Sequence, residues 1–120
     1  MLNDVAAANV RQFTQRHPDA APIEVMTGDA TRLPLPEGPL VLFLFNSLPA
    51  EAMKDFAAAV RSSYLASPRK IICIYYNTAH PAAFEEIGIF PVREPVHCPE
   101  DACDRYRTMQ FRALLFETWD

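Results

Sequence analysis

Glycine is scarce in this chain, and its scarcity excludes whole classes of nucleotide-binding protein. The 120 residues include only 3 glycines, at positions 28, 38 and 88. Phosphate-binding loops of the GxGxxG and GxxxxGK types need several glycines close together in the sequence. The three glycines are at least 10 residues apart. The chain therefore contains no loop of either type.

Long apolar runs, a leader and an excess of basic residues are absent too. No stretch reaches the roughly 18 to 20 apolar residues that span a bilayer, and Met1–Asp4 does not begin a signal peptide. The odd count of 3 cysteines then indicates free thiols in a reducing, cytoplasmic setting. A net charge of −4 argues against generic nucleic-acid binding, which needs clustered Lys and Arg. We expect a cytoplasmic protein that binds neither membranes nor nucleic acid in general.

The residues that are present predict one folded domain with alternating helices and strands. Half of the chain is apolar and 22% is charged, as in a globular protein. Ala6, Val10 and Phe13 recur at helical spacing, and three prolines between 34 and 39 exclude regular structure there. The predicted helices are 3–17, 49–65 and 81–87, and the predicted strands are 22–27, 40–45, 71–76, 92–97 and 108–119.

Two strands are apolar at nearly every position, which is typical of a parallel sheet covered on both faces. These strands are 40–45 and 71–76, and the helix between them makes a βαβ unit. Pro95 places the strand 92–97 near a sheet edge, and the short connection after it makes the last two strands antiparallel. The predicted fold is α/β and three-layered, with a mostly parallel sheet and an antiparallel C-terminal strand pair.

Small and polar residues stand where three of the predicted strands end. They are Gly28-Asp29-Ala30, Asn46-Ser47-Leu48-Pro49 and Tyr76-Asn77-Thr78. Ligands of open α/β sheets bind at the carboxyl ends of the parallel strands. A carboxylate and carboxamides at that edge suit a ligand that carries amino and hydroxyl groups.

The ordered motifs GDA, LP, PLVLFLFNSLP and PRKIICIYYN resemble those of class I S-adenosylmethionine-dependent methyltransferases. The resemblance covers nearly all of the chain. It implies a Rossmann-like fold, with the family's sheet order 3-2-1-4-5-7-6 and strand 7 antiparallel, and S-adenosylmethionine as the cofactor. Asp29 matches the acidic residue that holds the adenine amino group, and Ala30 lies beside the ring. Asn46 matches the residue after strand 4, which lines the methyl-transfer site, so it is the predicted catalytic residue and also a cofactor-binding one.

The chain departs from the family pattern in two places. Asn46-Ser47-Leu48-Pro49 lacks the Pro-Pro-aromatic run of several amino-methylating members, so the methyl acceptor stays unidentified. The family's glycine-rich loop and the acidic residue ending its second strand would both precede Met1. We therefore interpret residues 1–120 as the C-terminal two-thirds of such a domain, impaired in methyl transfer by itself. Strands 22–27 and 40–45 would lose their usual neighbours, which predicts association into a homo-oligomer through unpaired edges, or poor folding.

Other interpretations of the same residues stay open. Asp29 and Asn46 are also suited to turn formation or helix capping, and a capping role is favoured for Ser47. His97, Cys98 and Cys103 lack a second pair of ligands, so we predict a turn with free thiols and no metal site. The whole chain could serve as a non-catalytic interaction module on a methyltransferase scaffold, or as another nucleotide-binding, doubly wound protein.

Overall fold

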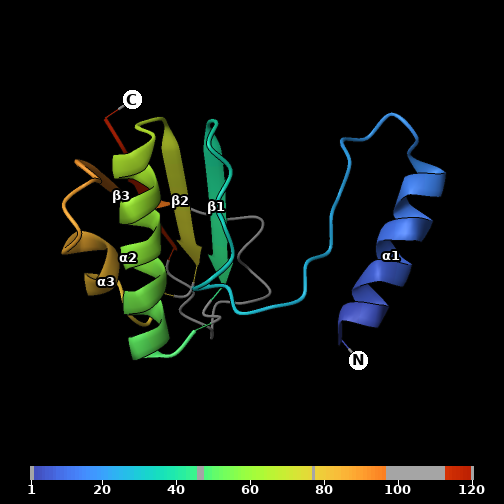
Figure 1. The fold of residues 1–120 in the computed structure, drawn as a ribbon, viewed down its shortest axis with the longest axis horizontal. Coiled ribbons are helices and arrows are strands. Elements are labelled where there is room, and N and C mark those ends of the chain that lie inside the picture. The colour runs from blue at the N-terminus through green and yellow to red at the C-terminus, as the bar shows by residue number, and fades with distance from the viewer. Residues whose placement is uncertain (1, 46–47, 77, 97–112, 120) are drawn as a thin grey trace.

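A computed structural model describes residues 2–45, 48–76, 78–96 and 113–119 (Figure 1). It has an α/β fold with an open, mixed, four-stranded sheet. The helices are α1 (Leu2–Arg16), α2 (Ala50–Ala66) and α3 (Ala82–Glu85), and the strands are β1 (Leu40–Phe45), β2 (Ile71–Tyr76), β3 (Val92–Val96) and β4 (Ala113–Glu117). The predicted helix 81–87 is shorter than expected, and the predicted segment 108–112 lies outside the described residues.

The sheet order is β1-β2-β4-β3. β1 and β2 are parallel, and β4 runs antiparallel to both of its neighbours. β1, β2 and β3 therefore run in one direction and β4 runs in the other. This agrees with the prediction of a mostly parallel sheet with an antiparallel C-terminal strand pair. β3 lies at one edge, as Pro95 predicts, because proline has no N–H to donate to a second neighbour.

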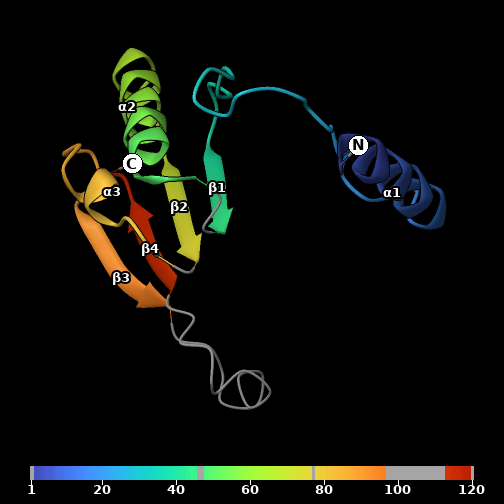
Figure 2. The same cartoon turned by 90° about the horizontal axis from the view of Figure 1, so that it is seen from below.

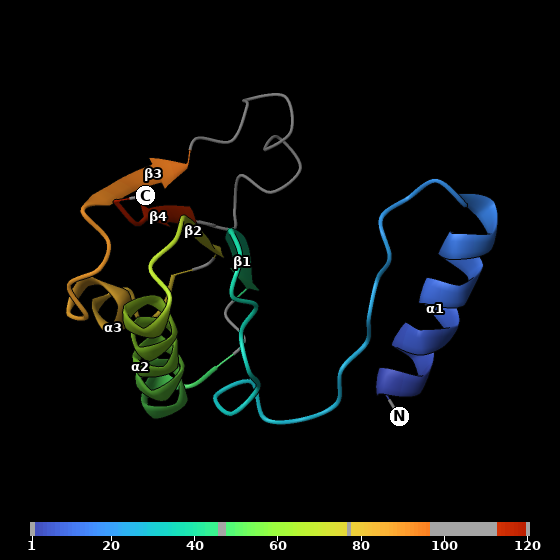
Figure 3. The same cartoon turned by 45° about the horizontal axis from the view of Figure 1, so that its top comes forward.

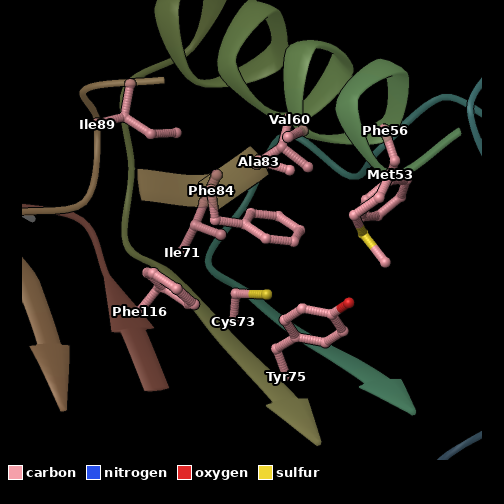
Figure 4. Close-up of a cluster of buried hydrophobic side chains, with 11 residues drawn as sticks. Met53, Phe56, Val60, Ile71, Cys73, Tyr75, Ala83, Phe84, Ile89 and Phe116 are labelled. Carbon is pink, nitrogen blue, oxygen red and sulfur yellow. The ribbon is translucent and has the colours of Figure 1, made fainter. Parts of the chain in front are cut away.

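One face of the sheet carries the hydrophobic core (Figure 4). α2 contributes Met53, Phe56, Ala57 and Val60, which recur at helical spacing and are all buried. Phe84 of α3 lies at the centre, with its ring near those of Phe56, Tyr75, Phe90 and Phe116. Figure 2 shows α2 and α3 together on this side of the strands.

The opposite face of the sheet is open, so the prediction that strand 40–45 is buried on both faces is wrong. Val41, Phe43 and Phe45 are 63%, 65% and 50% exposed, while the alternating Leu40, Leu42 and Leu44 pack against the core. The cause is topological, since α2, α3 and the turn after Gly28 all lie on one side. Among the described residues, no helix forms the third layer that the sequence predicts.

The N-terminal part also differs from the prediction. α1 forms as expected, but it stands apart from the sheet in all three views (Figures 1 to 3), and none of residues 3–16 is buried. The predicted strand 22–27 is wrong, because these residues have no regular structure. A strand needs a hydrogen-bonded neighbour, and the described sheet gives this segment none.

Candidate functional site

Asp29 begins a single hydrogen-bonded turn. The backbone N–H groups of Arg32 and Leu33 donate to the Asp29 carbonyl at 3.0 and 3.2 Å. Asp29 Oδ1 accepts hydrogen bonds from the Thr31 backbone N–H at 2.9 Å and from the Thr31 hydroxyl at 2.7 Å. One carboxylate oxygen therefore stabilises the turn itself, as in an Asx-turn.

The second oxygen of the Asp29 carboxylate remains available to a ligand. Oδ2 lies 3.8 Å from Arg32 Nε, and the Asp29 side chain is 55% exposed. The hydrogen bonds from the Thr31 hydroxyl and backbone N–H lower the pKa of Asp29 below its ordinary value, and Arg32 adds a smaller effect in the same direction. The carboxylate is thus charged at neutral pH and suited to accept from an amino or hydroxyl group.

The chain that follows this turn is fixed to the core by Arg69, which sequence reasoning did not identify. Arg69 is 8% exposed. Its guanidinium donates to the carbonyls of Gly38 (3.0 Å), Pro36 (2.6 Å) and Ser63 (2.9 Å), among others. These bonds join the loop before β1 to the last turns of α2. The sequence places Arg69 two residues before an apolar strand, and that position alone gives no sign that its side chain is buried.

A cavity of about 400 Å³ lies between this loop and α2. Thr31 to Leu35 line one side, and hydroxyl-bearing residues of α2 and its C-terminal end, including Ser62, Ser63 and Ser67, line the other. The volume lies in the range that small-molecule sites occupy. Asp29 and Ala30 do not line the cavity, but Thr31, which binds Asp29, does. Figure 3 shows the turn near β1 and α2.

Of the other two predicted cofactor-binding residues, Ala30 and Asn46, the structure describes only Ala30, which follows Asp29 directly in the chain. Ala30 is partly buried, and its side chain packs against the hydrophobic core. Asn46, Ser47 and Asn77 lie outside the described residues, as do the segment with Cys98 and Cys103 and its predicted turn. Cys73 is buried in the core, and burial raises the pKa of its thiol to about 12, so it is not a nucleophile at neutral pH.

The described ranges contain no cluster of three or more His, Cys, Asp or Glu side chains arranged to hold a metal ion. Within the same ranges, no helix has the length and apolar character needed to cross a membrane. The described site consists of the Asp29 carboxylate with its turn, and a neighbouring cavity whose lining includes Arg32, Glu37 and several hydroxyl-bearing side chains. Comparison with known proteins gives no match to a family model, to a curated protein or to a solved structure.

Proposed function

We propose that this chain is part of an S-adenosylmethionine-dependent methyltransferase domain and takes part in methyl transfer to an unidentified acceptor. The order and direction of the strands are the observation that carries the proposal. In the family that the sequence resembles, the sheet ends in the order 4-5-7-6, and only strand 7 is reversed. β1-β2-β4-β3, in which only β4 is reversed, has the same order and directions. Many α/β folds share parallel strands, but insertion of the last strand between the two before it is a more selective feature.

The residues at the turn fit the adenine end of the cofactor. Oδ2 of Asp29 is a charged acceptor for the adenine amino group, and Ala30 supplies a small apolar neighbour for the ring. The cavity begins at the next residue, Thr31, so a group bound at Oδ2 would lie beside the cavity and not among its lining residues. The bound cofactor supplies an electrophilic methyl group on a positively charged sulfur. Asn46, outside the described residues, would line the site of transfer.

The methionine end of the cofactor has no matching loop, because the 3 glycines are scattered. We therefore expect weak binding by this chain alone. Methyl transfer in line between two bound groups mainly requires that they be positioned, so no acid or base is assigned.

Calorimetric titration with S-adenosylhomocysteine tests this proposal. We expect the unmodified chain to bind it, and Asp29→Ala to raise the dissociation constant on the order of tenfold, since a hydrogen bond to a charged group is lost. Asp55→Ala is the matched control, because Asp55 is an exposed carboxylate on α2 and should bind as the unmodified chain does. Equal affinities for all three proteins would refute the assignment of Asp29.

The second candidate is a non-catalytic interaction module on the same scaffold. Two observations favour it: one Asp29 oxygen is engaged in its own turn, and one sheet face is open and apolar. A chain that binds no S-adenosylhomocysteine at millimolar concentration but does associate through that face would support this candidate over the first.

A further inference from the structure

On the open face of the sheet, exposed apolar side chains of β1 lie beside partly buried apolar side chains of β2 and β4, and Glu117 of β4 lies beside Ile72. The register places Val41 and Phe43 of β1 beside Ile72 and Ile74 of β2, and Leu115 of β4 beside Ile74. Val41 and Phe43 are 63% and 65% exposed. Val41 and Phe43 alternate along β1 and are both more than half exposed, and exposed large apolar side chains grouped in this way mark a surface that binds another apolar surface.

The same chain presents a helix with an apolar side that no core covers. Ala6, Val10 and Phe13 lie on one side of α1, and Phe13 is 42% exposed. With 15 residues, α1 is at the length where an isolated helix in water is only marginally stable, so it needs a surface to pack against. At about 1.5 Å per residue it is roughly as long as six-residue β1 at about 3.3 Å per residue.

The path of the chain separates this helix from its own sheet face. Arg69 fixes the loop 36–38 beside α2, and Leu35 packs against the core on that side. The connection to α1 therefore leaves from the covered side, and α1 would have to pass around the edge strand β1 to reach the open face of its own sheet. Figure 2 shows α1 beyond that edge.

We propose that this chain forms a two-fold symmetric dimer by exchange of helices. In this dimer, α1 of each copy packs on the open sheet face of the other copy. Within the described residues, each copy leaves α1 and one face of its sheet uncovered, and reciprocal exchange would cover both in each copy. The exchange uses the apolar side of α1 and the Val41–Phe43 surface of β1. This proposal does not depend on the methyltransferase assignment.

Sedimentation velocity on the full chain tests the exchange. We expect a mass of about twice 13.5 kDa. Phe13→Glu in α1 and Phe43→Glu in β1 should each raise the dimer dissociation constant on the order of a hundredfold, because each places a charge in an apolar contact made twice. Gln15→Glu, on the opposite side of α1, and Leu65→Glu, at an exposed position of α2, are the matched controls and should remain dimeric.

Mixing the two monomeric variants separates exchange from other modes of association. In a mixed dimer, the unaltered α1 of Phe43→Glu meets the unaltered face of Phe13→Glu, so one of the two contacts is restored. We expect mixed dimers to form where neither variant associates alone, with circular dichroism confirming that both are folded. A monomeric parent chain, a dimer insensitive to Phe13→Glu, or a mixture that stays monomeric would each overturn the proposal.

Discussion

Asp29 shows how one carboxylate can serve both a turn and a ligand. Its Oδ1 accepts two hydrogen bonds from Thr31, and its Oδ2 faces only Arg32 among the contacts described here. The motif Gly28-Asp29-Ala30 predicts both roles from the sequence, because Asp commonly forms Asx-turns and is also a charged acceptor. The structure establishes the first role, and the second stays a proposal.

The pKa of Asp29 gives a direct measure of the turn. The Thr31 hydroxyl makes the largest contribution to lowering it. In the folded chain the carboxylate is therefore stabilised relative to the unfolded chain. The stabilisation is present at neutral pH and is lost as the pH falls through the lowered folded-state pKa.

We expect Thr31→Val to raise the pKa of Asp29 toward its ordinary value, as followed by carboxyl-carbon NMR during an acid titration. The backbone N–H bond remains in this variant, so the rise should be partial. Thr27→Val is the control, because the Thr27 hydroxyl accepts from Asn3 and makes no described contact with Asp29. A Thr31→Val titration that matches that of the unmodified chain would contradict this description of the turn.

The elements show which sequence signals are strong enough to predict structure. α2, β1 and β2 form where they are predicted, because their apolar spacing and their Pro boundaries agree. The prediction of a strand at 22–27 is wrong. Ile23 and Val25 have the alternation of a strand, but no strand in the described sheet pairs with them. The prediction that strand 40–45 is buried on both faces is wrong for a related reason. An apolar run shows that both faces of a strand are suited to burial. It does not show whether the rest of the chain provides helices to cover both faces.

Arg69 connects two elements that the sequence gives no reason to join. It is a buried cation whose hydrogen bonds within the described residues go to four backbone carbonyls and the Ser63 hydroxyl, all of them uncharged. An arginine beside a predicted strand is usually read as a solvated flank, so its burial could not be predicted from a pattern of apolar residues. Its role depends on the fold that brings residues 36–38 to the end of α2.

We expect Arg69→Met to destabilise the chain by about 3 kcal/mol, because several buried carbonyls lose their donors. The loss would be measured as the free energy of unfolding in urea. Arg61→Met is the matched control, since Arg61 is exposed and donates one hydrogen bond, to the Ile87 carbonyl; it should cost about 1 kcal/mol or less. Equal losses in the two variants would show that Arg69 does not anchor the loop.

In the molecule as a whole, one face of the sheet is covered and the other face is exposed. α2, α3 and the turn at Asp29 lie on one side of the sheet, and Val41, Phe43 and their neighbours are exposed on the other side. The candidate site and the proposed dimer surface thus lie on opposite sides of β1. Exchange of α1 would leave the cavity beside Thr31 accessible, so ligand binding and association can be measured independently.

The proposed function depends on recognition of an adenine amino group by Asp29. Calorimetry with S-adenosylhomocysteine and with its inosine counterpart, in which a carbonyl oxygen replaces that amino group, measures this recognition. We predict that the unmodified chain binds the amino-bearing ligand on the order of ten times more tightly and that Asp29→Ala binds the two ligands equally. Equal affinity of the unmodified chain for both ligands, or the same preference retained in Asp29→Ala, would contradict the proposal.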